Sequence, residues 1–266
     1  MEFDVAAATR IVAQVRPSLT GHQVEDETFE VRLDGSPQAS VEILDAEYGG
    51  RLDVVDSATG QLSIHYRATV AVIDDPQPLV PRHGSPALER LELARPSRYC
   101  PSDHVGGIAA AEFGAIDGAG AQAAAIASWI HDRIGYVAGS TDVHDSAEHT
   151  LLTGQGVCRD FAHLGILLCR ALDIPARFAA VFAPGLDPMD FHAVFEAWHD
   201  DGWWVYDATR LAPRQSLVRI ATGRDAADTS FATVIGGRAT LTEMSVMATV
   251  DGELPTDDHA SLVALG

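Results

Sequence analysis

The sequence of 266 residues contains no lysine, and all 18 of its basic residues are arginine. Schiff-base chemistry is therefore excluded, because no side-chain amine is available to form the imine. Acidic residues outnumber basic ones by 38 to 18, which gives a formal net charge of −20. Such an excess disfavours contact with a phosphate backbone, so we expect no nucleic-acid partner and interpret the acidic residues as a solvated surface.

Long apolar runs are also missing. No stretch approaches the roughly 20 apolar residues that a membrane span needs. The first residues, MEFDVAAATRIVAQV, lack the order of basic, apolar and small residues that is typical of a secretion signal. We therefore expect no membrane partner and a cytoplasmic location. With 47% hydrophobic residues, the chain can bury the core of one large domain or two modest ones.

Cysteine is scarce, with only Cys100, Cys158 and Cys169 in the chain. Three scattered cysteines cannot build a disulfide framework or a cysteine-rich zinc site. In a cytosolic protein each is either a small buried hydrophobe or a reactive thiol. Cys169 lies deep in an apolar stretch, and Cys100 has no helix start and no base nearby. We predict that both are structural, which leaves Cys158.

The first part of the chain has the pattern of β-structure. Residues 29–33 and 62–67 alternate apolar and polar side chains, and turn signals separate the alternating runs. This pattern predicts an N-terminal antiparallel β domain over residues 1–100. Prolines are dense over residues 75–101, which predicts a linker to a second domain. No combination of nucleophile, base and acid occurs in this part.

Residues 101–252 read as helices followed by strands, which predicts an α+β domain. The last helix is too broadly apolar for a surface helix and should be buried. The polar tail, residues 253–266, is expected to fray. The expected helices cover 120–134, 146–153 and 157–172, and the expected strands cover 176–182, 191–198, 203–207 and 240–250.

Cys158 has the setting of a nucleophile. Gly154 and Gly156 suit a tight turn into the helix, so Cys158 falls in its first turn. Its thiol then lies among unpaired backbone N–H groups at the positive end of the helix dipole, which favours the thiolate. The same N–H groups can donate to a developing oxyanion. Asp160 is interpreted as the cap of this helix. The alternative for Cys158 is a buried structural cysteine at a helix start.

A base and its partner follow on a predicted hairpin. If Trp198 pairs with Asp201 across a two-residue turn, His192 lies directly opposite Asp207, on the same face, with Cβ atoms about 5 Å apart. A carboxylate there would fix the imidazole tautomer and leave the other ring nitrogen for a thiol. A bulged turn would shift this register by one residue.

These motifs occur together, and in this order, in one known family. The chain resembles the bacterial transglutaminase-like family of papain-like cysteine enzymes, whose members are often described as cysteine proteases. The first hundred residues also resemble the region that commonly precedes this domain. Asp173 stands where the family commonly has glycine, and Ala208 stands where it commonly has proline. The matching segments are Gly-Val-Cys-Arg-Asp at 156–160, Asp-Ile-Pro-Ala-Arg at 173–177, His-Ala at 192–193 and Trp-Val-Tyr-Asp-Ala-Thr at 204–209.

The resemblance implies a papain-like α+β core in which the catalytic cysteine begins a helix packed on an antiparallel sheet. It implies Cys158 as the nucleophile, His192 as the general base and acid, and Asp207 as the partner that orients the histidine. The expected activity is acyl transfer on peptide or protein amide bonds through a thioester. Water would resolve the thioester in a peptidase or amidase, which we favour, and an amine would resolve it in a transglutaminase.

Two other functions remain open. The chain could be a catalytically silent protein-interaction module that keeps the fold, or a structural two-domain protein in which the triad match is accidental. We expect no cofactor and no metal site. No calcium motif is visible, and the histidines His144 and His149 lack the spacing of metal ligands. His163 points about 140° away from Cys158 on the helix, so we expect it to be packed. The oligomeric state is not indicated.

Overall fold

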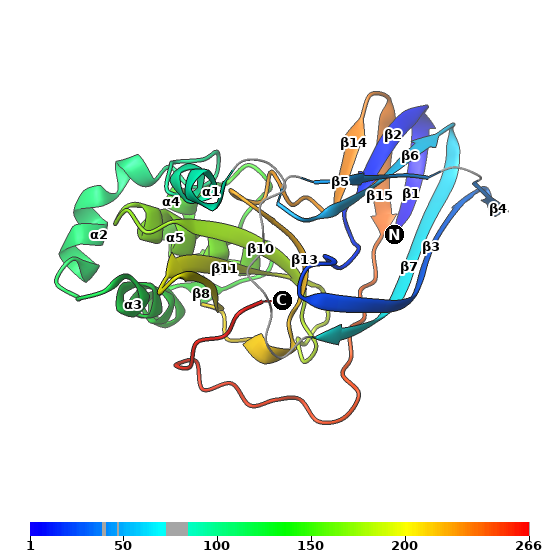
Figure 1. Cartoon of the computed structure of the whole chain (residues 1–266). Coiled ribbons are helices and arrows are strands. Elements are labelled where there is room, and N and C mark those ends of the chain that lie inside the picture. Colours follow the sequence, from blue (N-terminus) through cyan, green and yellow to red (C-terminus); the bar gives the residue numbers. More distant parts are fainter. Residues whose placement is uncertain (39–40, 47, 73–84, 266) are drawn as a thin grey trace.

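The computed structural model describes residues 1–38, 41–46, 48–72 and 85–265, and consists of a β-sandwich beside an α+β half (Figure 1). The sandwich has one sheet of strand order β15-β1-β7-β3-β4 and another of order β14-β2-β6-β5, with all neighbours antiparallel. Its strands are β1 (Glu2–Ala7), β2 (Thr9–Ala13), β3 (His22–Leu33), β4 (Ser36–Pro37), β5 (Glu42–Asp45), β6 (Arg51–Ser57), β7 (Gly60–Val72), β14 (Ala232–Ile235) and β15 (Arg238–Glu243).

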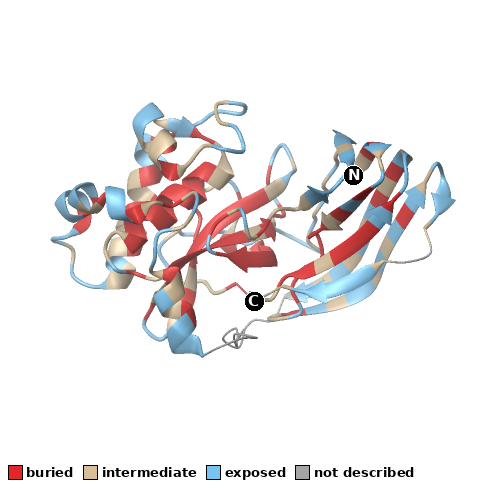
Figure 2. Cartoon of the chain, turned by 90° about the horizontal axis from the view of Figure 1, so that it is seen from above, coloured by how far each residue is buried: buried red, intermediate tan, exposed pale blue. Residues whose placement is uncertain are grey.

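Alternation along the strands creates the core of the sandwich. Every second residue points inward, so each sheet turns an apolar face to the other. Figure 2 shows buried residues, in red, interspersed with exposed and half-buried ones along the strands of the sandwich. The antiparallel β-structure predicted for the first part of the chain is confirmed, and the alternating runs are parts of the longer strands β3 and β7. The buried apolar residues are Phe3, Val5, Ile11, Ala13, Val31, Val55, Leu62 and Ile64.

The sandwich also takes strands from the far end of the chain. β14 pairs with β2, and β15 pairs with β1. The prediction that residues 101–252 form one domain is corrected by this pairing. The expected strand at 240–250 is also shorter, because the ladder ends at Glu243. Local pattern does not reveal these pairings, since they join residues more than two hundred positions apart.

The α+β half is a sheet of order β12-β11-β10-β13 with helices on one face. The long helix α5 is buried along almost its whole length, and the predicted α+β fold with a helix packed on an antiparallel sheet is confirmed. None of the helices in the described ranges is long and apolar enough to cross a lipid bilayer. The main elements are α3 (Ala119–Arg133), α4 (Ala147–Thr153), α5 (Cys158–Arg170), β10 (Ala176–Phe182), β11 (Phe191–His199), β12 (Gly202–Tyr206) and β13 (Val218–Gly223).

Two helices and an edge strand are among the elements of this half that were not expected. The proline-dense segment predicted to be a linker contains the helix α1 (Pro86–Leu93), while its residues 75–84 lie outside the described residues. Ser85 caps α1 by accepting a hydrogen bond from the Leu88 N–H. Pro86 occupies the first turn, where a backbone N–H has no acceptor within the helix, so the missing N–H of proline costs nothing. Helix α2 (Gly106–Phe113) and strand β13 are too short for their periodicity to be distinctive.

The C-terminal tail packs against the sheet, and the expectation that it frays is wrong. The Val205 N–H of β12 donates to the Val263 carbonyl, at 2.8 Å, so the tail covers the edge of the sheet. Asp257 forms an ion pair with Arg214 at 2.8 Å, and Leu265 is buried in an apolar cluster on the face of the sheet opposite α5. The composition of the tail is polar, but a few well-placed contacts hold it.

Helix α5 approaches β11 very closely. A Cβ atom on Gly165 would lie 2.4 Å from the Phe195 ring, so only glycine fits at this contact. Asp173, just after the helix, adopts φ +60°, the left-handed conformation that favours glycine at helix ends. The close contact fixes how far the helix start lies from the strand that carries His192.

Candidate active site

Cys158 is the first residue of α5, which agrees with its expected place in the first turn, and it is partly exposed. Asp160 caps the helix, because its Oδ2 accepts a hydrogen bond from the Val157 N–H at 2.9 Å. Arg159 donates a hydrogen bond to Oδ1 of the same carboxylate. Asp160 is almost completely buried, and both of its carboxylate oxygens have a partner. Gly156 has no room for a side chain, since a Cβ atom there would lie 2.7 Å from the Cβ of Asp160. These contacts hold the thiol at the helix N-terminus.

Tyr136 lies beside Cys158, and sequence reasoning missed it. The short strands β8 (Gly135–Tyr136) and β9 (Gln155–Gly156) pair in parallel, which places Tyr136 next to the turn before the cysteine. Burial and the neighbouring thiol, to which the phenol hydrogen-bonds, raise the pKa of Tyr136 to about 12. The Cys158 backbone N–H also interacts with this hydroxyl. A tyrosine after a helix carries no sequence signal for such a contact.

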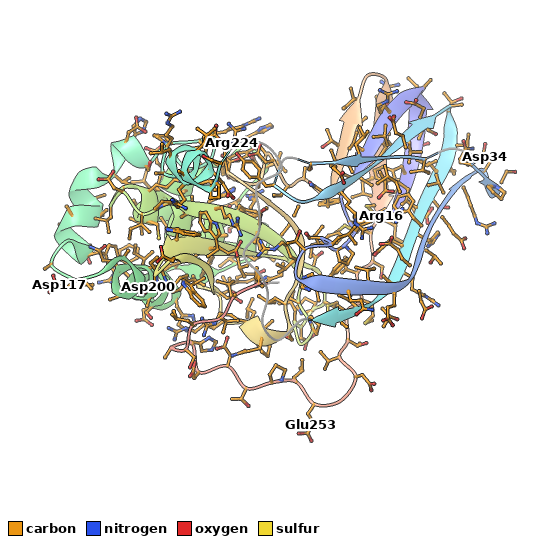
Figure 3. All side chains as sticks on the ribbon, in the orientation of Figure 1. Arg16, Asp34, Asp117, Asp200, Arg224 and Glu253 are labelled. Atoms are coloured by element: carbon orange, nitrogen blue, oxygen red, sulfur yellow. The ribbon has the colours of Figure 1, made fainter. Side chains whose placement is uncertain are left out.

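His192 and Asp207 are brought together, but through a register that differs from the predicted one. The hairpin turn is Asp200-Asp201, with φ +47° and +58°, so His199 pairs with Gly202 and Trp198 pairs with Trp203. Figure 3 shows Asp200 at the end of the hairpin beside α3. The predicted pairing of Trp198 with Asp201 is therefore wrong by two residues.

The two-residue shift preserves the contact between the side chains. A shift by an even number keeps both residues on the same face of the hairpin, so His192 meets Asp207 diagonally instead of directly. The distance from His192 Nε2 to Asp207 Oδ2 is 2.9 Å, and both side chains are buried. Because an ionised carboxylate can only accept, Nε2 carries the proton in this contact.

The other ring nitrogen of His192, Nδ1, is not used by the contact with Asp207. His192 Nδ1 is buried and has no hydrogen-bond partner among the described residues within the distance and angle limits of a full hydrogen bond. Burial alone would lower the pKa of His192, but the Asp207 carboxylate and the neighbouring Cys158 thiol raise it to about 10. The imidazole is therefore a cation at neutral pH, and the Cys158 thiol lies beside it.

Thr209 fixes Asp207 in turn. Its hydroxyl donates to Asp207 Oδ1 at 2.7 Å, and its backbone N–H donates to the same oxygen at 2.9 Å. Burial raises the pKa of Asp207, but the His192 cation and the Thr209 donors lower it more, so the net shift is downward. One carboxylate oxygen is thus used for orientation, and the other is left for the histidine.

A buried ion-pair network supports the strand that carries His192. Glu196 lies on the same face of β11 and is completely buried. Its Oε2 accepts from Arg177 Nε at 2.8 Å and from Arg219 Nη1 at 2.7 Å. Arg177 also pairs with Glu89 of α1 at 3.1 Å. Burial raises the pKa of Glu196, but the two guanidinium groups lower it further, to about 2. The carboxylate therefore stays charged.

The remaining cysteines and His163 are structural, as predicted. Cys100 and Cys169 are free and buried, and desolvation raises the pKa of each thiol to about 12. His163 stacks on Tyr99, with ring centroids 5.1 Å apart, and its Nε2 accepts from the Ala226 N–H at 3.1 Å. Burial lowers the pKa of His163 to about 4, so it is neutral and packed.

The polar residues before α5 form local contacts. His149 lies 3.9 Å from Asp145, and His144 donates its backbone N–H to Asp142. Within the described ranges, no group of three or more histidine, cysteine or acidic side chains is placed to hold a metal ion. The Asp142 carboxylate thus accepts a hydrogen bond within its own loop.

Comparison with known proteins identifies the family and the fold. Residues 109–208 match the model of the transglutaminase-like superfamily. The crystal structure of a putative cysteine protease from Cytophaga hutchinsonii is 37% identical, with a TM-score of 0.86 over 98% of this chain and 93% of that one. An uncharacterized protein of Mycobacterium leprae is 34% identical over 113 residues. That match spans 39% of this chain and 40% of the relative, so it covers less than half of either.

The fold and the arrangement of the site define a class, that of the cysteine-based enzyme fold in which the thiol begins a buried helix. The similarity to the Cytophaga protein runs along nearly the whole chain, sandwich included. The chain therefore belongs to the transglutaminase-like superfamily, and the resemblance seen in the sequence is confirmed.

Proposed function

We propose that this protein is a cysteine-dependent acyl-transfer enzyme that acts on peptide or protein amide bonds through the triad Cys158, His192 and Asp207. One observation carries the proposal. The buried imidazole of His192 has Nε2 on Asp207 and a free Nδ1, and the nearest chemistry for that nitrogen is the thiol of Cys158. A carboxylate that orients one ring nitrogen and a thiol beside the ring form the arrangement of a nucleophile with its base.

The mechanism follows from these positions. The Cys158 sulfur, with His192 as the cation beside it, attacks the amide carbon, and the C=O electrons move to oxygen. The Cys158 N–H and the Tyr136 hydroxyl lie near each other and near the sulfur, so both can donate to the oxyanion. His192 then protonates the leaving amine from Nδ1, and the C–N bond breaks to leave a thioester. Asp207 keeps the imidazole oriented throughout.

Water or an amine resolves the thioester. In hydrolysis, neutral His192 takes a proton from water, the carboxylic acid leaves and the thiolate–imidazolium pair is restored. We favour hydrolysis, because no amine-binding site is identifiable among the described residues.

Two probes test the activity. Fluorescein-labelled casein reports hydrolysis, and N,N-dimethylcasein with a fluorescent cadaverine reports transfer to an amine. Wild-type protein should act on at least one of them, and Cys158→Ala should act on neither. If wild type and Cys158→Ala are equally inert while Cys158 labels with iodoacetamide no faster than an ordinary thiol, the non-catalytic interaction module becomes the better interpretation.

Replacing Tyr136 by phenylalanine should separate bond cleavage from thiol activation. Loss of one oxyanion donor is expected to lower kcat about 10- to 100-fold, somewhat less than the roughly 10²- to 10³-fold seen for a fully buried donor, because Tyr136 is half-exposed. The rate of iodoacetamide labelling of Cys158 should stay within a few-fold of wild type, since that reaction forms no oxyanion. Faster turnover in Tyr136→Phe would show instead that the hydroxyl restrains the resting thiol.

The pH profile of cleavage should report the His192 cation. Its pKa is raised to about 10 by Asp207 and Cys158, so the proton needed by the leaving amine is present below that pH and lost above it. Asp207→Asn removes the charge that raises the pKa, and the alkaline limb should move down by about two pH units or more. Thr209→Val is the matched control, because it removes one hydrogen bond to Asp207 and keeps the carboxylate. An alkaline limb unmoved in Asp207→Asn would contradict the assignment.

A further inference from the structure

Strand β7 is longer than its neighbour on one side. β1 pairs with β7 only from Gly60 to Ser63, and Met1 ends the ladder by exchanging two hydrogen bonds with Ile64, of 3.0 and 2.9 Å. On the other side, β3 follows β7 as far as Val72. In the part of the chain that the structure describes, β7 from His65 to Val72 therefore has no strand beside it on the β1 side. Eight residues of strand span about 26 Å.

The alternation of a strand identifies the backbone groups on this free edge. Ile64 directs both its N–H and its C=O toward β1. Because successive residues direct these groups to opposite sides, the N–H and C=O of Tyr66, Ala68 and Val70 face the same way as those of Ile64. They form a row of donors and acceptors at strand spacing, and none of the described hydrogen bonds uses them.

A second extended segment faces this edge. After β15, residues 244–250 alternate between half-buried and exposed side chains, as a strand does, although they pair with no strand among the described residues. β15 and β7 both pair with β1 at Glu2, so they flank it at about 4.8 Å on each side. Figure 1 shows the chain that leaves β15, in orange, running past the end of β7.

β7 and the segment 244–251 form two walls of a cavity of about 990 Å³. The cavity lies where β1 would continue if it were longer. We call this cavity the β1 slot. The rest of its lining is largely apolar and comes from both halves of the protein. It includes Phe191, the residue immediately before His192, so the slot lies where the sandwich meets the sheet of the active site. The apolar lining residues used in this argument are Ile64, Val70, Phe182, Phe191, Val218 and Val246.

We propose that the β1 slot binds an extended segment of the polypeptide substrate, which adds to β7 as a strand in continuation of β1. A row of unpaired backbone groups recognises another backbone, and an apolar lining selects alternate apolar side chains. Walls on both sides admit a single strand and exclude the edge of a folded sheet, so the occupant is an unfolded or flexible segment and not a second copy of this chain. The proposal rests on the proposed function in one respect, that the bound polypeptide is the substrate.

Binding can be measured without turnover in the Cys158→Ala protein. The probe is fluorescein-labelled, reduced and carboxymethylated α-lactalbumin, a permanently unfolded polypeptide, and the readout is fluorescence anisotropy. In the same background, Ala68→Pro removes one N–H that faces the slot and no N–H that pairs with β3, so the strand should persist. We expect binding at least ten-fold weaker, with the thermal unfolding midpoint little changed.

A pair of extended proteins tests the slot without altering the folded chain. Six residues Val-Thr-Val-Thr-Val-Thr added before Met1 should continue β1 into the slot and abolish binding of the probe. Six residues Gly-Ser-Gly-Ser-Gly-Ser should leave binding intact. Equal binding by both extended proteins and by the parent would overturn the proposal. So would a dimer of the parent that dissociates in Ala68→Pro, because a second copy would then fill the slot.

Failure of the proposed function would look different. If Cys158 in the otherwise unaltered chain is no more reactive than an ordinary thiol, yet the probe binds through the slot, the protein binds polypeptides without cleaving them. If Cys158 is activated and the probe binds equally to both extended proteins, catalysis stands and the slot is wrong.

Discussion

In His192→Ala, iodoacetamide labelling of Cys158 at pH 6 should fall by two orders of magnitude or more. An ordinary thiol, with a pKa near 8.5, is only about 0.3% thiolate at pH 6, and the thiolate is the form that reacts. In the wild-type protein, the neighbouring imidazole is cationic at this pH, because Asp207 and the thiol together raise its pKa to about 10. Removing the imidazole removes the positive charge that stabilises the sulfur anion, while the helix N-terminus remains.

The measurement is mass spectrometry of the modified peptide over time, from pH 5 to pH 9. Wild type should label faster than His192→Ala at the acidic end of the range, and the rate in His192→Ala should rise about tenfold per pH unit up to about pH 8 and level off above it, as for an ordinary thiol. The control is His144→Ala, which replaces an exposed histidine in the loop before α4 and should label like wild type. Cleavage of amides should fall further than labelling, by about 10³-fold or more, since the variant also lacks the acid for the leaving amine. Equal labelling of wild type and His192→Ala would contradict the assignment of the triad.

Glu196→Gln should lower the free energy of unfolding by about 3–5 kcal/mol at pH 7, the cost of leaving buried charges unpaired. The Glu196 carboxylate is completely buried between Arg177 and Arg219, and a neutral amide cannot balance two guanidinium groups. The pKa of Glu196 is lowered to about 2, so its contribution is present in full above the ordinary carboxyl pKa and is lost as pH falls through about 2.

Urea unfolding of both proteins gives this difference directly. Glu30→Gln is the matched control, because Glu30 pairs with Arg32 on the exposed face of β3, and such a pair contributes less than about 1 kcal/mol. Loss of less than 1 kcal/mol in Glu196→Gln would mean that water reaches the network and replaces the carboxylate. Activity should fall together with stability, since β11 also carries His192.

The site could be predicted from sequence to the extent that local chemistry determines it. Cys158 is recognisable because the glycines before it and the apolar residues after it define a helix start. His192 and Asp207 are recognisable because both fall on the same face of a hairpin, and an error of two residues in the pairing register leaves them on that face. The predicted turn is displaced because Asp200 and Asp201 both adopt positive φ. Aspartate tolerates this conformation, but its presence in a sequence does not predict it.

Other parts of the site depend on long-range pairing, which no local pattern shows. Tyr136 reaches Cys158 only because β8 and β9 pair. Glu89 sits in a proline-dense segment that reads as a linker, yet it joins a buried network on the far side of the sheet. Such residues become visible once the fold brings them together.

The return of β14 and β15 to the first sheets also determines when the sandwich can be completed during synthesis. A nascent chain that has left the ribosome as far as β7 has β1 and β2 with one neighbour missing on each, and those neighbours are encoded after residue 231. The unit with the thiol is thus an insertion within the sandwich, and must emerge before the sandwich closes. A fragment ending near residue 100 should expose two unpaired strand edges and aggregate. In the whole chain, the folded α+β unit brings its two ends close together, so that β14 and β15 can pair with β2 and β1.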